Sequence, residues 1–250
     1  MPTLLDHYRY FLKDTVRLTI DFSLTDQSRG VAPPPVEKPY SADGERIDLV
    51  PHGKWQGIST IDLISAIQNR SSHRQFTADP LSLDEVSFLL WATQGIRKKA
   101  NGATALRTVP SAGCRHALET YLCVLHVAGL EPGIYRYLPV EHQLLVVSRA
   151  PGLAKKLTAA ALNQSFVGKA PMTFIWTTIP YRMEWRYDIA AHKVIALDAG
   201  HVCQNLYLAS AAINAGTCAV AAYHQQLMDD LLGVDGENEF ALYLAPVGKI

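Results

Sequence analysis

The feature that most constrains the fold is a long segment, residues 26–57, in which neither helix nor regular strand is favoured. It carries ten residues that break regular structure, namely Pro33, Pro34, Pro35, Pro39, Pro51, Gly30, Asp43, Gly44, Gly53 and Gly57. Proline lacks a backbone N–H, and glycine and aspartate favour turns. We expect an extended arm that wraps its own domain or a partner subunit. The chain then divides into an N-terminal helix and arm, 1–57, and a main domain, 58–250.

Composition indicates a globular protein and excludes several functions. Hydrophobic residues make up 48% of the 250 residues, and the formal net charge is zero, so no basic excess is available for a nucleic-acid partner. No apolar run reaches the ~18–20 residues that span a bilayer, and the N-terminus does not resemble a secretory signal. The cysteines show neither C-x-x-C nor zinc-finger spacing. We expect a cytoplasmic protein with reduced thiols, no metal and no membrane contact.

Hydrophobic periodicity predicts the regular elements. Helices are expected at residues 4–18, 59–69, 82–94, 153–163 and 194–215. Strands are expected at 119–127, 133–137, 144–147, 172–178 and 240–247, of which the first three favour an antiparallel meander. Ser82 and Glu85 match a capping box, Ile61, Ile64 and Ile67 should form a buried face, and Gly216 should cap the longest helix. Without strict βαβ alternation, an α+β fold is predicted.

Three segments contain candidate binding residues. In Arg70-Ser71-Ser72-His73-Arg74, two guanidinium groups and two hydroxyls could bind a phosphate, although a solvated surface turn is the simpler interpretation. The small residues of 110–113 and 215–222 could approach a flat ring closely, although an ordinary turn is the simpler interpretation of each segment taken alone. No Rossmann, P-loop or nucleophile-elbow motif is present.

Several motifs occur together in a specific order. They are R-S-S-H-R-x-F from 70, L-L-W-A-T-Q-G-I from 89, R-T-V-P-S-A-G-C-R-H-A-L-E from 107, G-L-E-P-G-I-Y-R-Y from 129 and L-D-A-G-H-V-C-Q-N-L from 197. From about residue 36 to the C-terminus the chain resembles the FMN-dependent nitroreductase superfamily, and within it the branch of SagB-type dehydrogenases and azoline oxidases. The resemblance implies a mixed, mainly antiparallel sheet flanked by helices, in an intertwined homodimer with FMN at the subunit interface.

The resemblance also implies roles for individual residues. The FMN phosphate and ribityl chain would be held by Arg70, Ser71, Ser72 and Arg74, with Lys249 as the C-terminal basic residue. Gln94 would reach the flavin. Its ring would be covered from the partner subunit by Pro110, Ser111 and Ala112, with Cys114 behind them. The ring would also lie against Ala219, Val220, Ala221 and Ala222, with a backbone N–H of Ala221 or Ala222 near N5.

The sequence departs from the azoline-oxidising pattern at one informative place. Those members carry a Lys-Tyr pair before the A-G-H helix, where this chain has Arg186-Tyr187. Lysine can act as a base when its pKa is lowered, whereas arginine does not readily lose its proton. Arg186 and Tyr187 are therefore the candidates for handling protons or substrate, while the flavin would carry the redox chemistry.

The resemblance therefore predicts an FMN-dependent oxidoreductase. It would transfer hydride or electrons from NAD(P)H through the flavin to an electron-poor acceptor, a nitroaromatic or a quinone. Two alternatives stay open. One is a SagB-type dehydrogenase of peptide heterocycles, which Arg186 disfavours; the other is a non-catalytic protein that binds flavin or acts through partners.

Overall fold

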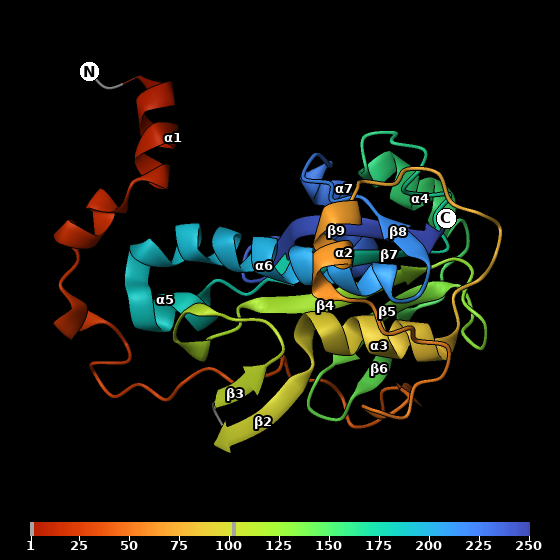
Figure 1. Ribbon diagram of the computed structural model, residues 1–250. Coiled ribbons are helices and arrows are strands. Elements are labelled where there is room, and N and C mark those ends of the chain that lie inside the picture. Colours follow the sequence, from red (N-terminus) through yellow and green to blue (C-terminus); the bar gives the residue numbers. More distant parts are fainter. Residues whose placement is uncertain (1–2, 102–103) are drawn as a thin grey trace.

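The computed structural model describes residues 3–101 and 104–250 (Figure 1). Its centre is a seven-stranded sheet in the order β1-β6-β5-β4-β7-β9-β8, in which every neighbouring pair is antiparallel. The strands are β1 (Arg46–Asp48), β4 (Leu118–Val124), β5 (Gly133–Leu138), β6 (Gln143–Ser148), β7 (Met172–Thr178), β8 (Ala215–Thr217) and β9 (Phe240–Lys249). A separate hairpin joins β2 (Ile96–Asn101) to β3 (Thr104–Arg107).

Helices α3 and α6 cover one face of the sheet, and α4 and α7 cover the other. The described helices are α1 (Leu4–Leu12), α2 (Leu63–Asn69), α3 (Leu83–Gln94), α4 (Leu153–Ala160), α5 (Tyr181–Tyr187), α6 (Ala191–Ala211) and α7 (Gln225–Leu232). Side chains alternate along a strand, so Leu122 of β4 joins the core under α3 and α6, while Cys123 joins the core under α4 and α7. Burial on both faces explains why β4, β5 and β7 are apolar runs rather than alternating ones.

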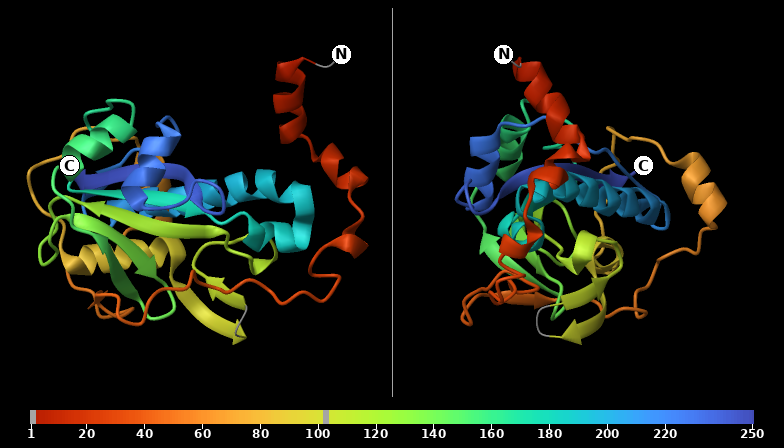
Figure 2. Two further views of the ribbon diagram at one scale, coloured as in Figure 1. Left: turned by 180° about the vertical axis from the view of Figure 1, so that it is seen from behind. Right: turned by 90° about the vertical axis from the view of Figure 1, so that its left-hand side faces the viewer.

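The α+β prediction and the meander of β4, β5 and β6 are confirmed. The capping box is also present, because Ser82 accepts a hydrogen bond from the Glu85 N–H and Glu85 accepts one from the Ser82 N–H. The arm is largely irregular, apart from β1, and it follows the body of its own chain (Figure 2). Sequence periodicity missed β1, the β2–β3 hairpin, α5 and α7.

Two predictions about helices are wrong. The helix expected at 59–69 begins only after Asp62, whose side chain caps it, and its apolar side chains face outward, with Ile64 77% exposed. The long helix ends at Ala211, so Gly216 is not its cap but the centre of β8. The helix at the N-terminus is likewise uncovered, since α1 buries none of its residues and stands away from the body (Figure 2).

Candidate functional site

The segment from Arg70 to Phe76 lies along the edge of the sheet, at β8 and β9. The His73 N–H donates to the Thr217 carbonyl over 2.9 Å, and the Thr77 N–H donates to the Lys249 carbonyl over 2.9 Å. The close approach of this segment to β8 requires glycine at position 216, because a Cβ there would lie 2.6 Å from the His73 side chain. The arginine-rich segment is therefore held by backbone contacts rather than by its own charged side chains.

Tyr207 of α6 connects this segment to the small-residue loop after β8. Its hydroxyl lies 2.9 Å from the Ser72 hydroxyl and accepts a hydrogen bond of 2.8 Å from the Ala219 N–H. The Arg70 guanidinium lies over the same ring, 5.2 Å from its centroid. The structure thus brings together the predicted residues of 70–74 and 219–222. Sequence reasoning missed Tyr207, which directly follows the last residue of the quoted motif.

The guanidinium groups of this segment lie over aromatic rings and are not paired with carboxylates in the described part of the chain. Among the residues that the structure describes, no Asp or Glu forms an ion pair with Arg70 or Arg74. Arg74 instead lies over Phe166, 5.8 Å from the ring centroid. Ser71 and Ser72 beside them are exposed, and the Ser71 hydroxyl contacts His73 Nε2 at 2.8 Å. Two uncompensated cations and exposed hydroxyls are a donor set suited to a phosphate.

Lys249 and Gln94 have partners elsewhere. The Lys249 ammonium donates to the Glu85 carboxylate and to the Ile213 carbonyl. Gln94 is 2% exposed, and its side-chain oxygen accepts a hydrogen bond of 2.9 Å from Arg107. Among the described residues, neither side chain forms a hydrogen bond or ion pair with residues 70–74. The assignment of Lys249 and Gln94 to the cofactor site therefore stays a prediction.

A second group of predicted residues surrounds the turn at Gly113, whose φ is +57°. A Cβ there would lie 2.8 Å from the Tyr187 hydroxyl and 2.9 Å from Arg186 Nε, so both side chains lie against this turn. Pro110, Ser111 and Cys114 line a cleft of about 670 Å³ between α3, α6 and the β2–β3 hairpin. The structure therefore brings the residues of 110–114 together with the Arg186-Tyr187 pair.

Two buried titratable groups flank this loop. Burial raises the pKa of the Asp198 carboxyl, on α6, above its usual value, and the nearby polar groups of Ser111 and Ala112 oppose this shift only in part. Burial, together with the charge of Arg107, lowers the pKa of His116 to about 3. At neutral pH His116 is therefore uncharged. The sequence analysis singled out neither residue, because no local pattern around Asp198 or His116 indicates burial beside the loop.

The two groups lie at different places along α6. Tyr207 contacts the first group and Asp198 the second, and nine residues at ~1.5 Å each separate them by about 13 Å along the helix. A single chain thus presents two half-sites, one with cationic side chains and one with the small-residue loop at 110–114.

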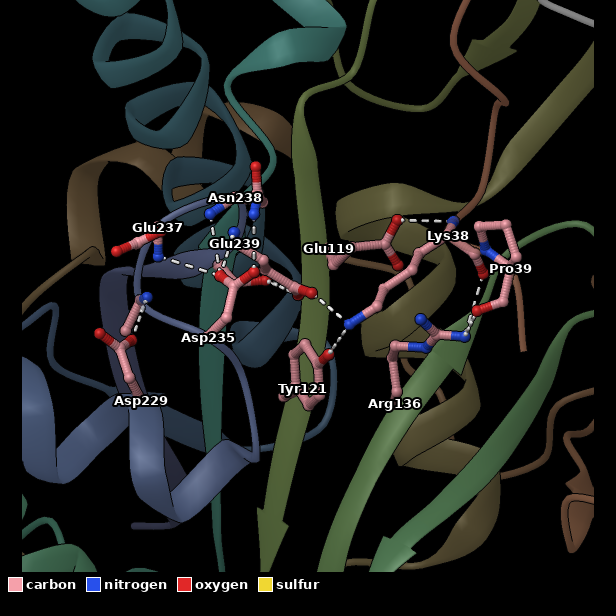
Figure 3. A network of polar contacts seen from close by, with 12 residues as sticks. Lys38, Pro39, Glu119, Tyr121, Arg136, Asp229, Asp235, Glu237, Asn238 and Glu239 are labelled. Atoms are coloured by element: carbon pink, nitrogen blue, oxygen red, sulfur yellow. Dashed lines mark hydrogen bonds and ion pairs between the residues drawn. The ribbon is translucent and has the colours of Figure 1, made fainter. Parts of the chain in front are cut away.

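The arm is anchored by a buried charge network (Figure 3). Arg107, Arg136 and Arg182 are each at most 3% exposed. Arg107 donates to the Val36 carbonyl over 2.8 Å, and Arg136 donates to the Lys38 carbonyl over 3.0 Å. Glu119 accepts from the Lys38 N–H and forms a 2.6 Å ion pair with Arg182. Burial opposes ionisation of Glu119, but the arginines outweigh it and hold its pKa below the usual value.

The same network extends across the sheet to the turn before β9. The Lys38 ammonium donates to the Glu239 carboxylate, which also accepts a hydrogen bond of 2.6 Å from Thr177. No local sequence pattern predicted this network, since its members come from segments far apart in the chain. Its contacts explain why the proline-rich arm follows its own domain.

Comparison with known proteins identifies the family. The model of the nitroreductase family matches residues 67–249, and the chain belongs to this family. A nitroreductase-named protein of Methanocaldococcus jannaschii is 32% identical over 192 residues, which cover 77% of this chain and 93% of that protein. The resemblance read from the ordered motifs is thereby confirmed.

Further matches are a trifolitoxin-processing protein and two solved structures that share the fold. The trifolitoxin-processing protein TfxB of Rhizobium leguminosarum bv. trifolii is 29% identical over 170 residues, 65% of this chain but only 46% of TfxB. Among solved structures, a nitroreductase-named protein of Ralstonia eutropha matches with a TM-score of 0.68 and 24% identity, over 87% of this chain and 94% of that chain. A chain of the Escherichia coli microcin synthetase McbBCD complex matches with a TM-score of 0.62 and 19% identity, over 100% and 98%.

These likenesses establish the nitroreductase-type fold and an oxidoreductase family. Among the described helices, none is long and apolar enough to cross a membrane. The described residues also contain no group of three or more His, Cys, Asp or Glu side chains arranged to hold a metal ion.

Proposed function

We propose that this chain is an FMN-dependent NAD(P)H oxidoreductase. The observation that carries the proposal is the pair of uncompensated guanidinium groups, Arg70 and Arg74, on a segment fixed to the sheet edge beside the small-residue loop 219–222. The residues present fit the group: Arg70, Ser71, Ser72 and Arg74 would hold the phosphate and ribityl chain. Bound FMN would supply the reversible hydride-transfer chemistry.

The chain's own residues position and cover the cofactor. The Tyr207 hydroxyl contacts both the Ser72 hydroxyl and the Ala219 N–H. One side chain would therefore support the residues at the phosphate of the bound FMN and the residues at its ring. Ala219, Val220, Ala221 and Ala222 would lie against the ring, since small side chains let the backbone come close. Gln94 and Lys249 would contribute only after changing the partners they have in this chain.

We further propose an obligate homodimer that completes each site. The loop Pro110, Ser111, Ala112 and Cys114 is about 13 Å along α6 from the cationic half-site of its own chain, so a partner's loop would cover the ring. Apolar side chains on α1, α2 and α6 are uncovered, with Leu4, Ile64 and Leu197 exposed by 72%, 77% and 55%. Such surface on three helices supports a large apolar interface.

The acceptor would be electron-poor, a quinone or a nitroaromatic. Reduction of a quinone consumes NAD(P)H and one proton and yields NAD(P)⁺ and hydroquinone, so a proton must enter at the acceptor. The Tyr187 hydroxyl lies against the Gly113 turn, and we assign to it the handling of this proton.

The unpaired state of all four cysteines supports a cytoplasmic location.

A peptide-heterocycle dehydrogenase is the second candidate. The likeness to TfxB and to a chain of the microcin synthetase complex supports it. Arg186, which stands where azoline-oxidising members carry lysine, opposes it, because arginine stays protonated. Arg186→Lys should leave FMN binding unchanged, since Arg186 lies at the 110–114 half-site; loss of FMN from this variant would show that the residue belongs to the cofactor site.

Anaerobic reduction tests the proposed function. Purified protein should show flavin absorbance, release FMN rather than FAD on denaturation, and bleach when NADH or NADPH is added. Light scattering at low micromolar concentration should give twice the 27.5 kDa mass of the chain. A colourless protein that takes up no added FMN contradicts the cofactor proposal, and a 27.5 kDa monomer with one bound FMN contradicts the shared site.

A further inference from the structure

We infer that Arg97 binds the carboxylate of a flat aromatic substrate that lies in the cleft of about 670 Å³ between α3, α6 and the β2–β3 hairpin. The inference rests on the proposed function, because it names the class of electron-poor acceptor that the oxidoreductase would reduce. The shape and charge of the cleft do not depend on the flavin. Arg97 directly follows the motif that ends at Ile96, so the ordered motifs did not include it.

The cleft has the size and the walls of a small-molecule site. Ligand pockets usually enclose ~300–1,000 Å³ and are lined mainly by apolar and aromatic side chains, with a few polar groups that fix the orientation of the ligand. Phe88 and Trp91 of α3, Val109 and Leu208 of α6 line this cleft, and the loop 110–114 borders it. A flat ring bound here would therefore lie beside the loop that we expect to cover the partner's flavin.

Arg97 of β2 stands at the wall of the cleft with one edge of its guanidinium group fixed. Its Nε donates a hydrogen bond of 3.0 Å to the Arg107 carbonyl. Among the residues that the structure describes, its two terminal nitrogens form no hydrogen bond and no ion pair. Guanidinium N–H groups bind both oxygens of one carboxylate. The contact with Arg107 therefore orients the side chain and leaves it able to bind an anion.

The wall of the cleft is positively charged. Arg107 lines it, is only 3% exposed, and has no hydrogen-bond partner for its Nε in the described part of the chain. Glu119 offsets part of this charge but does not line the cleft, and no Asp or Glu is present among the described lining residues. Burial lowers the pKa of His116, which also lines the cleft, and the charges of Arg107 and Arg115 lower it further. The cleft therefore favours an anionic ligand over a neutral one.

One molecule can contact both the cation and the loop. Arg97 and the loop 110–114 line the same cleft, so a ligand that fills it reaches both. With its carboxylate bound to Arg97, the apolar ring would pack against Phe88 and Trp91, which favour flat aromatic groups. The hairpin that carries Arg97 projects from the body beside α3 (Figure 1). Arg97 is thus a specificity-determining residue rather than a catalytic one.

Matched ligands test the charge and the place of binding. Calorimetric titration of the oxidised protein as isolated, without NAD(P)H, gives dissociation constants for 4-nitrobenzoate and 4-nitrobenzamide, which differ in charge but little in shape. The variants are Arg97→Gln, Lys98→Gln and Leu208→Trp. Lys98→Gln removes the same charge from the next residue of the hairpin, which is exposed and is not among the lining residues. Leu208→Trp fills the apolar part of the cleft.

The parent and Lys98→Gln should bind nitrobenzoate about tenfold more tightly than nitrobenzamide, the lower end for hydrogen bonds to a charged group. Arg97→Gln should remove this preference and leave the affinity for nitrobenzamide within about twofold. Leu208→Trp should weaken both ligands by at least about fivefold, because overpacking excludes the ring. Equal affinities in the parent, a preference that survives in Arg97→Gln or is lost in Lys98→Gln, or unchanged binding to Leu208→Trp would each overturn the inference.

Turnover separates this site from the proposed function. With NADH as donor, Arg97→Gln should raise the KM for nitrobenzoate by about tenfold and leave kcat and the KM for nitrobenzamide unchanged. A protein that prefers nitrobenzoate in the titration but reduces neither compound contradicts the proposed function and leaves the carboxylate site. A protein that reduces both compounds with equal KM contradicts the carboxylate site alone. If Arg97→Gln removes only a preference for NADPH over NADH, the anion is the phosphate of the donor, and the assignment to the acceptor is wrong.

Discussion

Two groups of arginines in this molecule have opposite environments. Arg107, Arg136 and Arg182 are buried, and each is bonded to a carbonyl or to Glu119. Arg70 and Arg74 lie on the sheet edge, stacked on Tyr207 and Phe166, with no carboxylate paired to them in the described chain. One group forms hydrogen bonds and an ion pair within the protein and holds the arm, whereas the other keeps its charge available.

The difference shows how to separate structural from ligand-binding arginines. A buried guanidinium must be neutralised and hydrogen-bonded, because leaving it alone costs several kcal/mol. An exposed arginine is solvated and contributes little to the stability of the folded chain, but its charge remains available to an anion. Substitutions in the first group should therefore change stability, and substitutions in the second should change ligand affinity.

The largest effect is expected at Glu119. Glu119→Gln removes the negative charge that faces Arg182, Arg136 and Arg107, so the free energy of unfolding should fall by about 3–5 kcal/mol. Urea denaturation measures this free energy of unfolding. As a control, Glu131→Gln removes a carboxylate that pairs with Arg149 but is 75% exposed, and it should change stability by at most ~0.5 kcal/mol. Similar losses in both variants would contradict the structural role of the network.

Arg74→Ala should affect the ligand instead of the fold. It should weaken FMN binding by about 1.5–3 kcal/mol, the range for hydrogen bonds to charged groups, and leave the unfolding of the FMN-free protein within ~0.5 kcal/mol of the parent. Fluorescence titration and urea denaturation give the two values. A variant that is strongly destabilised without FMN would place Arg74 in the same class as Arg182.

Glu37 tests the buried arm through pH. Burial raises the pKa of its carboxyl to about 7, so the folded protein binds a proton that the unfolded chain loses near pH 4.5. Stability should therefore fall as pH rises from about 4.5 to 7 and then level off. Allowing for partial exposure, Glu37→Gln should remove about 1–2 kcal/mol of this fall. If the free energies of unfolding of the parent and of Glu37→Gln changed in parallel between pH 4.5 and 7, the Glu37 carboxyl would be solvated in the folded protein.

The smallest effect is expected at Tyr207. Tyr207→Phe keeps the ring under Arg70 but removes the hydroxyl that contacts Ser72 and the Ala219 N–H. FMN affinity should fall by about 0.5–1.5 kcal/mol, the net value of a typical hydrogen bond. Tyr223→Phe, whose hydroxyl donates to the Ala241 carbonyl away from this framework, serves as the control and should not alter affinity.

Local patterns in the sequence predicted much of the fold. The Ser82–Glu85 capping box and the apolar runs of β4, β5 and β7 depend on neighbouring residues, so they were found correctly. The face of α2 was placed inward because periodicity identifies an apolar face without saying what covers it. Gly216 was assigned to a helix end because the close approach of His73, which needs glycine there, is a long-range contact.

The candidate site could be predicted only as separate segments. The motifs at 70–74, 110–114 and 219–222 were found, but their grouping into two half-sites depends on α6. Tyr207, Asp198 and Glu119 were missed, because each acts through contacts with segments far away in the chain. The uncompensated charge of Arg70 and Arg74 likewise emerges only when the positions of all described carboxylates are known.

The central claim is that this uncompensated charge binds the phosphate of FMN. Riboflavin has the same ring and ribityl chain without the phosphate, so comparing dissociation constants for FMN and riboflavin isolates that group. We predict that the parent protein binds FMN at least about tenfold more tightly, and that Arg70→Gln combined with Arg74→Gln removes the difference while riboflavin affinity stays constant. Equal affinities for the two flavins in the parent protein would contradict the account.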